Sequence, residues 1–158
     1  MIELKPVNIK RFDLIKSSYV KTMSQYLQRI NHKPLDEIEE YFTRIVNGTI
    51  KRKWDLRHHH FREIYLMPEK QKIGFVWYRT LVDEMFSDVV VLQWIDTEIK
   101  SNLRKYAKEI FDALNEELKK MEINRMVVET YGEFDALAGM WEDMGFSPVR
   151  VVMNRQIQ

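Results

Sequence analysis

The apolar side chains in the first third of the chain are spaced as they are on amphipathic helices. They recur at helical intervals over residues 12–30, behind Asn8, a residue type that often caps a helix N-terminus. A second apolar stripe runs through residues 33–48, with Pro34 near its start and Gly48 at its end. The pattern therefore predicts two consecutive helices.

Segments rich in aromatic and β-branched residues predict strands on either side of these helices. Residues 2–6 alternate apolar and polar side chains before the first helix. After the second helix, residues 59–67 and 72–81 flank the turn-like "PEKQ" at 68–71, which favours a β-hairpin. The nearly continuous apolar run "DVVVLQWI" at 88–95 is typical of a strand covered on both faces.

The remaining chain predicts alternating helices and strands. A long helix over residues 100–121 leads to a strand over 124–131. A short helix over 134–144, closed by Gly145 as a left-handed C-cap, precedes a last strand over 147–157. The expected order is β-α-α-β-β-β-α-β-α-β, an α/β fold. Consecutive strands favour antiparallel neighbours and the β-α-β crossover favours a parallel pair, so we expect a mixed sheet with helices on both faces.

Composition narrows the class of protein. A chain of 158 residues without a visible linker is expected to form a single domain, 1–158. It has no cysteine, hence no disulfide or thiolate nucleophile, and its 25 basic and 24 acidic residues do not suit a dedicated nucleic-acid binder. Because there is no apolar signal region and no run of about 18 apolar residues, we expect a cytoplasmic protein with no membrane partner.

The run "HHH" and the aromatic residues invite two other interpretations. Only His58 and His60 could share one face of a strand, and two histidines without a placed carboxylate make a poor metal site. We therefore expect no metal. A base-stacking platform is disfavoured because the neighbours Trp77 and Tyr78 must face opposite sides of the sheet, which favours core packing.

The element order in a chain of this length resembles the GNAT superfamily of acetyl-CoA-dependent N-acetyltransferases. Three local features carry the resemblance. Gly74 in "QKIGFVWYR" is similar to the start of the family's third strand, and the strand–helix–strand unit over 89–131 is similar to its cofactor-binding core. The ending "MWEDMGFSPVRVVM" at 140–153 is similar to the family's last helix and strand.

The resemblance implies acetyl-CoA as cosubstrate, with its pyrophosphate on the N-terminus of the long helix, where N–H groups and the dipole favour anions. The family loop, Gln/Arg-x-x-Gly-x-Gly/Ala, falls on Asn102 to Ala107, where Ala107 fits and Lys105 replaces a glycine. Lys100, Arg104 and Lys105 would supply positive charge, and Ser101 could cap the helix. The implied cofactor-binding residues are Trp94, Ile95, Asp96, Asn102, Leu103, Arg104, Lys105, Tyr106, Ala107 and Trp141.

Candidate catalytic residues follow from the same resemblance. A backbone N–H of the strand at Trp94 to Asp96 would polarise the thioester carbonyl. The tyrosine that many members carry on the last helix is replaced by Trp141, so Tyr131 is the substitute candidate for the acid. Glu98, just beyond the strand, and Glu129 are the candidate bases.

We therefore expect an N-acetyltransferase that transfers acetyl from acetyl-CoA to an amine of a protein or small molecule. The alternative is a catalytically inactive GNAT-fold protein that serves as a binding or regulatory module. The departures at Lys105 and Trp141 favour the alternative, while the element order suits both. The last predicted strand could also pair across a homodimer.

Overall fold

The computed structural model describes residues 1–7, 12–50, 58–81, 89–130 and 136–151, together with 153, 155 and 157. The regular elements within these ranges follow the predicted order as far as the fifth strand. They are β1 (Ile2–Pro6), α1 (Phe12–Asn31), α2 (Leu35–Ile50), β2 (His59–Leu66), β3 (Gln71–Leu81), β4 (Val89–Thr97), α3 (Lys100–Lys120) and β5 (Arg125–Val128).

The strands form one mixed sheet whose spatial order equals their order along the chain, β1-β2-β3-β4-β5. Neighbouring strands from β1 to β4 are antiparallel, and β4 and β5 are parallel. The parallel pair is joined through α3, as the crossover pattern predicted. The predicted α/β class and mixed sheet are confirmed.

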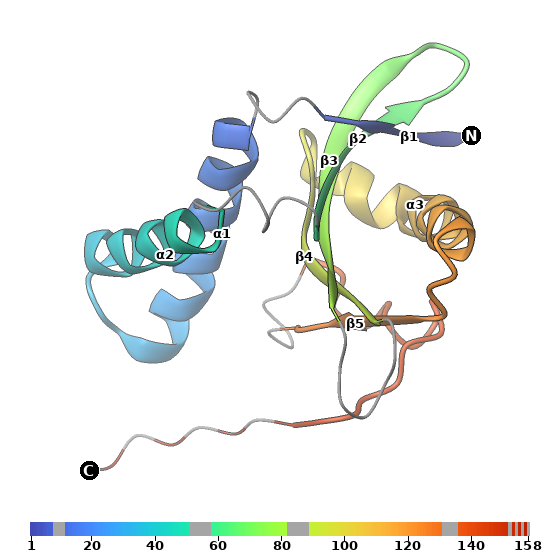
Figure 1. The fold of residues 1–158 in the computed structure, drawn as a ribbon. Coiled ribbons are helices and arrows are strands. Elements are labelled where there is room, and N and C mark those ends of the chain that lie inside the picture. The colour runs from blue at the N-terminus through green and yellow to red at the C-terminus, as the bar shows by residue number, and fades with distance from the viewer. Residues whose placement is uncertain are drawn as a thin grey trace.

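Helices cover both faces of the sheet, with α3 on one face and α1 and α2 on the other (Figure 1). Each face has its own apolar cluster, because strand side chains alternate between the faces. Val76 and Tyr78 of β3 pack with the α3 cluster, whereas Trp77 between them packs with the α1–α2 cluster. The aromatic residues of β3 are thus core residues, as predicted.

A polar cluster crosses the α3 side of this core. Arg62 Nε donates to Glu117 Oε1 at 2.7 Å, and the Tyr78 hydroxyl donates to the same oxygen. The His60 ring stacks on Tyr78 with centroids 4.8 Å apart, and its buried Nε2 has no hydrogen-bond partner. Burial chiefly lowers the pKa of His60, and Arg62 lowers it further, against the opposing charge of Glu117.

The end of the chain differs from the prediction. The expected helix over 134–144 is a run of turns over its described part, 136–145, because Gly139 adopts a φ of 77° and interrupts the helical path. Gly145 closes the run with a φ of 88°, as predicted. Phe146 N donates to Trp141 O at 3.0 Å and Gly145 N to Glu142 O at 2.9 Å, which is the bonding of a Schellman cap.

The last predicted strand is not observed in the described residues of 147–157, which are exposed and outside the sheet. Its apolar members, Val149, Val151, Met153 and Ile157, are each at least 75% exposed. An alternating pattern specifies which side chains share a face of a strand but not whether a partner strand is available. The predicted cap at Asn8 lies outside the described residues.

Candidate cofactor slot and acceptor face

The parallel pair β4–β5 is joined along only half of β4. Val89 to Leu92 pair with Arg125 to Val128, and the ladder ends at Leu92 and Val128. β4 continues to Thr97 with β3 as its partner on the other side. The β5-facing edge of this second half therefore presents backbone groups that no described strand pairs, which is the edge that an extended ligand can use.

A β-bulge lies where the two strands separate. Trp77 pairs with Trp94 and Tyr78 with Leu92, so Gln93 is an extra residue of β4. Bulges bend a strand and reverse the faces of the residues that follow. Leu92 accordingly packs on the α3 side, whereas Trp94 turns towards α1.

Close approach of β3 to the end of β4 depends on Gly74. A Cβ at this position would lie 2.2 Å from the carbonyl oxygen of Asp96 and 2.8 Å from Cα of Thr97. These are backbone atoms, so no side-chain movement could relieve the contact. The feature that resembled the family pattern in the sequence thus has a local physical cause.

Helix α3 begins directly after β4, next to the unpaired edge. Its N-cap is Ile99, which has no side-chain capping bond, and its first turn contains no acidic residue. Ser101 therefore lies inside the first turn, and the expectation that it caps the helix is wrong. Asn102 N donates to Ile99 O at 2.8 Å, and Thr97 Oγ1 donates to the same carbonyl at 2.8 Å. No acidic residue within the first turn and no capping side chain of Ile99 offsets the positive end of the helix dipole.

The predicted phosphate-binding residues occupy different faces of α3. Leu103 and Ala107 are buried against the sheet, so they can offer only backbone groups. Arg104 is exposed, and its Nη1 donates to the carbonyls of Ala136 and Ala138 at 3.1 and 3.2 Å. Lys105 is exposed and its Nζ lies 4.9 Å from the Tyr106 ring centre, with Asn102 and Tyr106 half-buried.

The end of β4 is tied to α1 through one hydroxyl. Ser18 Oγ donates to Asp96 Oδ2 at 2.9 Å and accepts a long hydrogen bond from Trp94 Nε1 at 3.4 Å. Asp96 Oδ1 also accepts from the Thr97 N–H at 2.8 Å. Ile95, on the opposite face, is buried with the α3 cluster. Both Trp94 and Asp96 thus face α1, and the carboxylate of Asp96 is already engaged.

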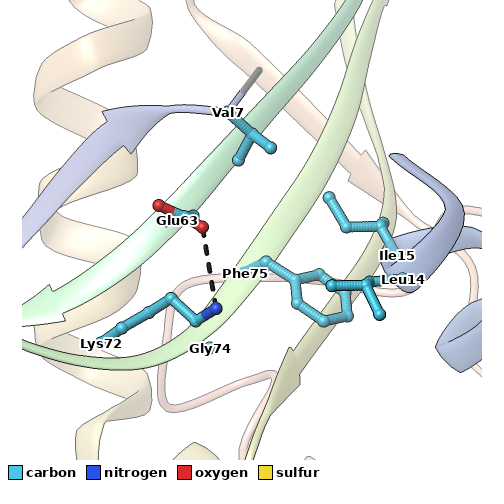
Figure 2. A pocket seen from close by; sticks show the side chains of 7 residues that line it. All are labelled: Val7, Leu14, Ile15, Glu63, Lys72, Gly74 and Phe75. Atoms are coloured by element: carbon cyan, nitrogen blue, oxygen red, sulfur yellow. Dashed lines mark ion pairs between the residues drawn. The ribbon is translucent and has the colours of Figure 1, made fainter. Parts of the chain in front are cut away.

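The candidate base Glu98 forms an ion pair with Lys72, one of the residues that line a small hollow beside β3. Lys72 Nζ lies 3.6 Å from Glu98 and 3.7 Å from Glu63. Figure 2 shows the Lys72–Glu63 pair on one side of the hollow and Leu14 and Ile15 of α1 on the other, with Phe75 between them. A volume of about 30 Å³ would hold little more than ordered water. Glu98 itself is 60% exposed, and its described partner is Lys72.

Of the two remaining predicted site residues, the structure describes Trp141 but not Tyr131. The Trp141 ring packs against Phe111 and Phe146 with centroids 5.8 and 5.2 Å away, on the α3 side. Its Nε1 is buried and has no hydrogen-bond partner among the described residues. Tyr131 lies outside the described residues. No three metal-ligating side chains gather within the ranges that the structure describes.

Tyr19 is a residue of this site that the sequence placed only in a helical stripe. Its ring contacts Trp77, Trp94 and Phe42 with centroids 5.3, 5.9 and 6.1 Å away. Burial, and then the negative charge of Glu129, raises the pKa of the Tyr19 hydroxyl. Helical periodicity could not distinguish this phenol from an ordinary core aromatic.

Solved acetyltransferase structures match the chain over its whole length. YycN from Bacillus subtilis, assigned as an acetyltransferase, has a TM-score of 0.82 and 16% identity, with 100% of this chain and 99% of that chain covered. The chain has the GNAT fold. An assigned acetyltransferase from Pyrococcus furiosus gives a TM-score of 0.68 at 12% identity, with 99% of this chain and 100% of the other covered.

A third GNAT-fold structure was solved with acetyl-CoA. This acetyltransferase from Clostridium acetobutylicum has a TM-score of 0.59 and 15% identity, covering 99% of this chain and 96% of its own. No family model and no curated protein sequence matches the chain. At these identities the GNAT likeness establishes the fold.

Among the helices that the structure describes, none combines the length and the apolar character that a membrane-spanning segment needs.

Proposed function

We propose that this GNAT-fold protein transfers an acetyl group from acetyl-CoA to an amine. The observation that carries the proposal is the end of the β4–β5 ladder at Leu92 and Val128, directly before the uncapped N-terminus of α3. This arrangement offers an unpaired strand edge next to a site that favours anions. Pantetheine amides suit the edge and phosphates suit the helix end.

Particular residues take roles in this proposal. The backbone of Trp94, Ile95 and Asp96 would bind the pantetheine arm and polarise the thioester carbonyl. The first turns of α3, Asn102 to Ala107, would hold the phosphates, with Lys105 as the cation that is free to reach them. Trp141, whose indole N–H lacks a partner, would flank the cofactor.

The transfer itself needs proton acceptance and donation. The amine nitrogen attacks the thioester carbonyl carbon, the C–S bond breaks, and the amine proton passes to a base. Glu98 would have to leave Lys72 to act, whereas Glu129 has no ion pair with a described residue. Glu129 is therefore the better candidate base. Tyr131 is proposed to protonate the departing thiolate.

Thermal denaturation with acetyl-CoA tests the proposal. A ligand that binds only the folded chain at about 100 times its Kd adds roughly 2.7 kcal/mol. For a domain of this size each kcal/mol raises Tm by roughly 2–4 °C, so a rise of about 5–10 °C is expected. Pantetheine should do less because it lacks the phosphates. No shift at saturating acetyl-CoA would indicate a GNAT-fold binding module, and a shift should be followed by thiol release with amine acceptors.

A further inference from the structure

A row of side chains crosses the sheet beneath α1, just before β4 and β5 separate. Arg79 of β3 pairs with Val91 of β4, which pairs with Val127 of β5, so all three side chains share one face. Val76 and Tyr78 face α3 while Trp77 faces α1 and α2, which places Arg79 on the α1 side. The row thus has a cation at one end.

Arg79 has no counter-ion in the described part of the chain. Its Nε is buried without a hydrogen-bond partner, and no described carboxylate forms an ion pair with it. Half-buried guanidinium groups are normally satisfied by carboxylates or phosphates, for which their fork of donors is shaped. The vacant donor therefore indicates a place for an anion that no described residue supplies.

A negative residue stands two positions beyond Val127 along the chain. Glu129 follows Val128, the last paired residue of β5, and is exposed. Tyr19 packs on the same face of the sheet, with its ring centre 5.3 Å from that of Trp77 and 5.9 Å from that of Trp94, the pair next to Arg79 and Val91. Burial raises the pKa of its hydroxyl, Glu129 raises it further and Arg79 lowers it. Val91, Trp94 and Val127 are only half-buried, whereas Val90 and Leu92 on the opposite face are buried. Among the described residues, this face of the two strands is therefore partly accessible to solvent.

We propose that this surface, formed by Arg79, Val91, Val127, Glu129 and Tyr19 and here named the acceptor face, binds an amine that also carries a carboxylate or phosphate. Arg79 holds the anionic group, and Glu129 holds the ammonium beside the point where β4 and β5 separate. Arg79 and Glu129 stand on strands two apart and are offset by two residues along the strands, so their backbones lie roughly 12 Å apart and their side chains suit a small bifunctional molecule. The inference rests on the proposed acetyl transfer for its reaction.

Calorimetric titration of the full chain, with and without CoA, tests the acceptor face directly. ω-Amino acids of increasing chain length are compared with their carboxamides, and aminoalkyl phosphates with the matching amino alcohols. The anionic member of the preferred pair should bind roughly tenfold or more tightly, since a charge-assisted hydrogen bond contributes at least that factor. Whichever comparison shows this preference, amino acid against carboxamide or aminoalkyl phosphate against amino alcohol, indicates whether the site binds a carboxylate or a phosphate.

Variants assign the preference to its residue. Arg79→Gln should abolish it, Arg79→Lys should keep part of it, and Lys108→Gln, which removes an exposed cation from the other side of the sheet, should keep all of it. Glu129→Gln should weaken binding of the amino acid but not of its N-acetyl derivative. Equal binding of neutral and anionic amines, or a preference that survives Arg79→Gln, would overturn the inference.

The two proposals can fail separately. Acetyl-CoA that stabilises wild type and Arg79→Gln equally, without any anion preference, leaves acetyl transfer standing and removes the acceptor assignment. An Arg79-dependent preference in a chain that acetyl-CoA does not stabilise keeps the acceptor face as a ligand site and removes the enzyme.

Discussion

Leu92 of β4 pairs with Val128 of β5, and their pair closes the parallel ladder while β4 runs on to Thr97. Separation at this pair exposes the β5-facing edge of β4 immediately before α3. The bulge at Gln93 lies at the same level, so the strand bends where it loses its partner. The proposed slot for the cofactor depends on this relationship.

Amide hydrogen exchange should show that the β5-facing edge of β4 beyond Leu92 is unpaired. We expect the β5-facing amides between Gln93 and Thr97 to exchange faster than those within the ladder from Val89 to Leu92, because no described strand protects them. Saturating acetyl-CoA should slow them selectively. If these amides already exchange slowly without ligand, or if acetyl-CoA does not change their exchange, the proposal that the cofactor binds at this edge of β4 would be contradicted.

Gly74→Ala should destabilise the protein and disturb the end of β4. The added methyl would lie 2.2 Å from the Asp96 carbonyl oxygen, so the strands must shift, at a cost of about 1–3 kcal/mol. Urea denaturation measures the loss. Gly48→Ala is the matched control. Gly48 lies within α2, which continues to Ile50 and does not end before this glycine as the sequence pattern predicted. It has open space, so alanine should stabilise the chain by about 0.5–1 kcal/mol.

Substitutions at Arg104 and at Lys105 should have different effects, the first on the stability of the fold and the second on CoA binding. Arg104→Ala removes two hydrogen bonds to the turns at 136 and 138 and should lower the free energy of unfolding by about 1 kcal/mol. Lys105→Ala should leave stability nearly unchanged but weaken CoA binding, because its charge is available to phosphates. The comparison needs both denaturation and CoA titration. Equal CoA affinity in Lys105→Ala and wild type would place the phosphates elsewhere.

His60 should make the fold less stable in mild acid. Its pKa is lowered in the folded state, chiefly by burial, so the unfolded chain binds a proton more readily. The free energy of unfolding should therefore fall as pH drops below the unfolded value of about 6.5. His60→Phe, which can keep the stacking on Tyr78, should remove this dependence. A slope that persists in the variant would assign it to other groups.

The sequence by itself determined most of the element order. Apolar spacing identified α1, α2 and α3, and aromatic and β-branched runs identified the strands, because burial on one face imposes a period that the chain must show. It also marked Gly145 as a cap, since only the local backbone conformation is involved. The predictions of a helix over 134–144 and a strand over 147–157 were wrong. Periodicity encodes neither the positive φ of Gly139 nor the presence of a partner strand.

Only the tertiary structure decided the site. In the sequence, Leu92 and Val128 look like ordinary strand residues. No local pattern indicates that theirs is the last pair of the β4–β5 ladder. The sequence suggested Arg104 as a phosphate ligand, and only the structure shows that its guanidinium donates to the carbonyls of Ala136 and Ala138. Tyr19, Arg79 and Glu129 come from separate elements, and their placement depends on strand register and on the packing of α1. Such long-range pairings arise from the assembled core, so a pattern read along one segment cannot contain them.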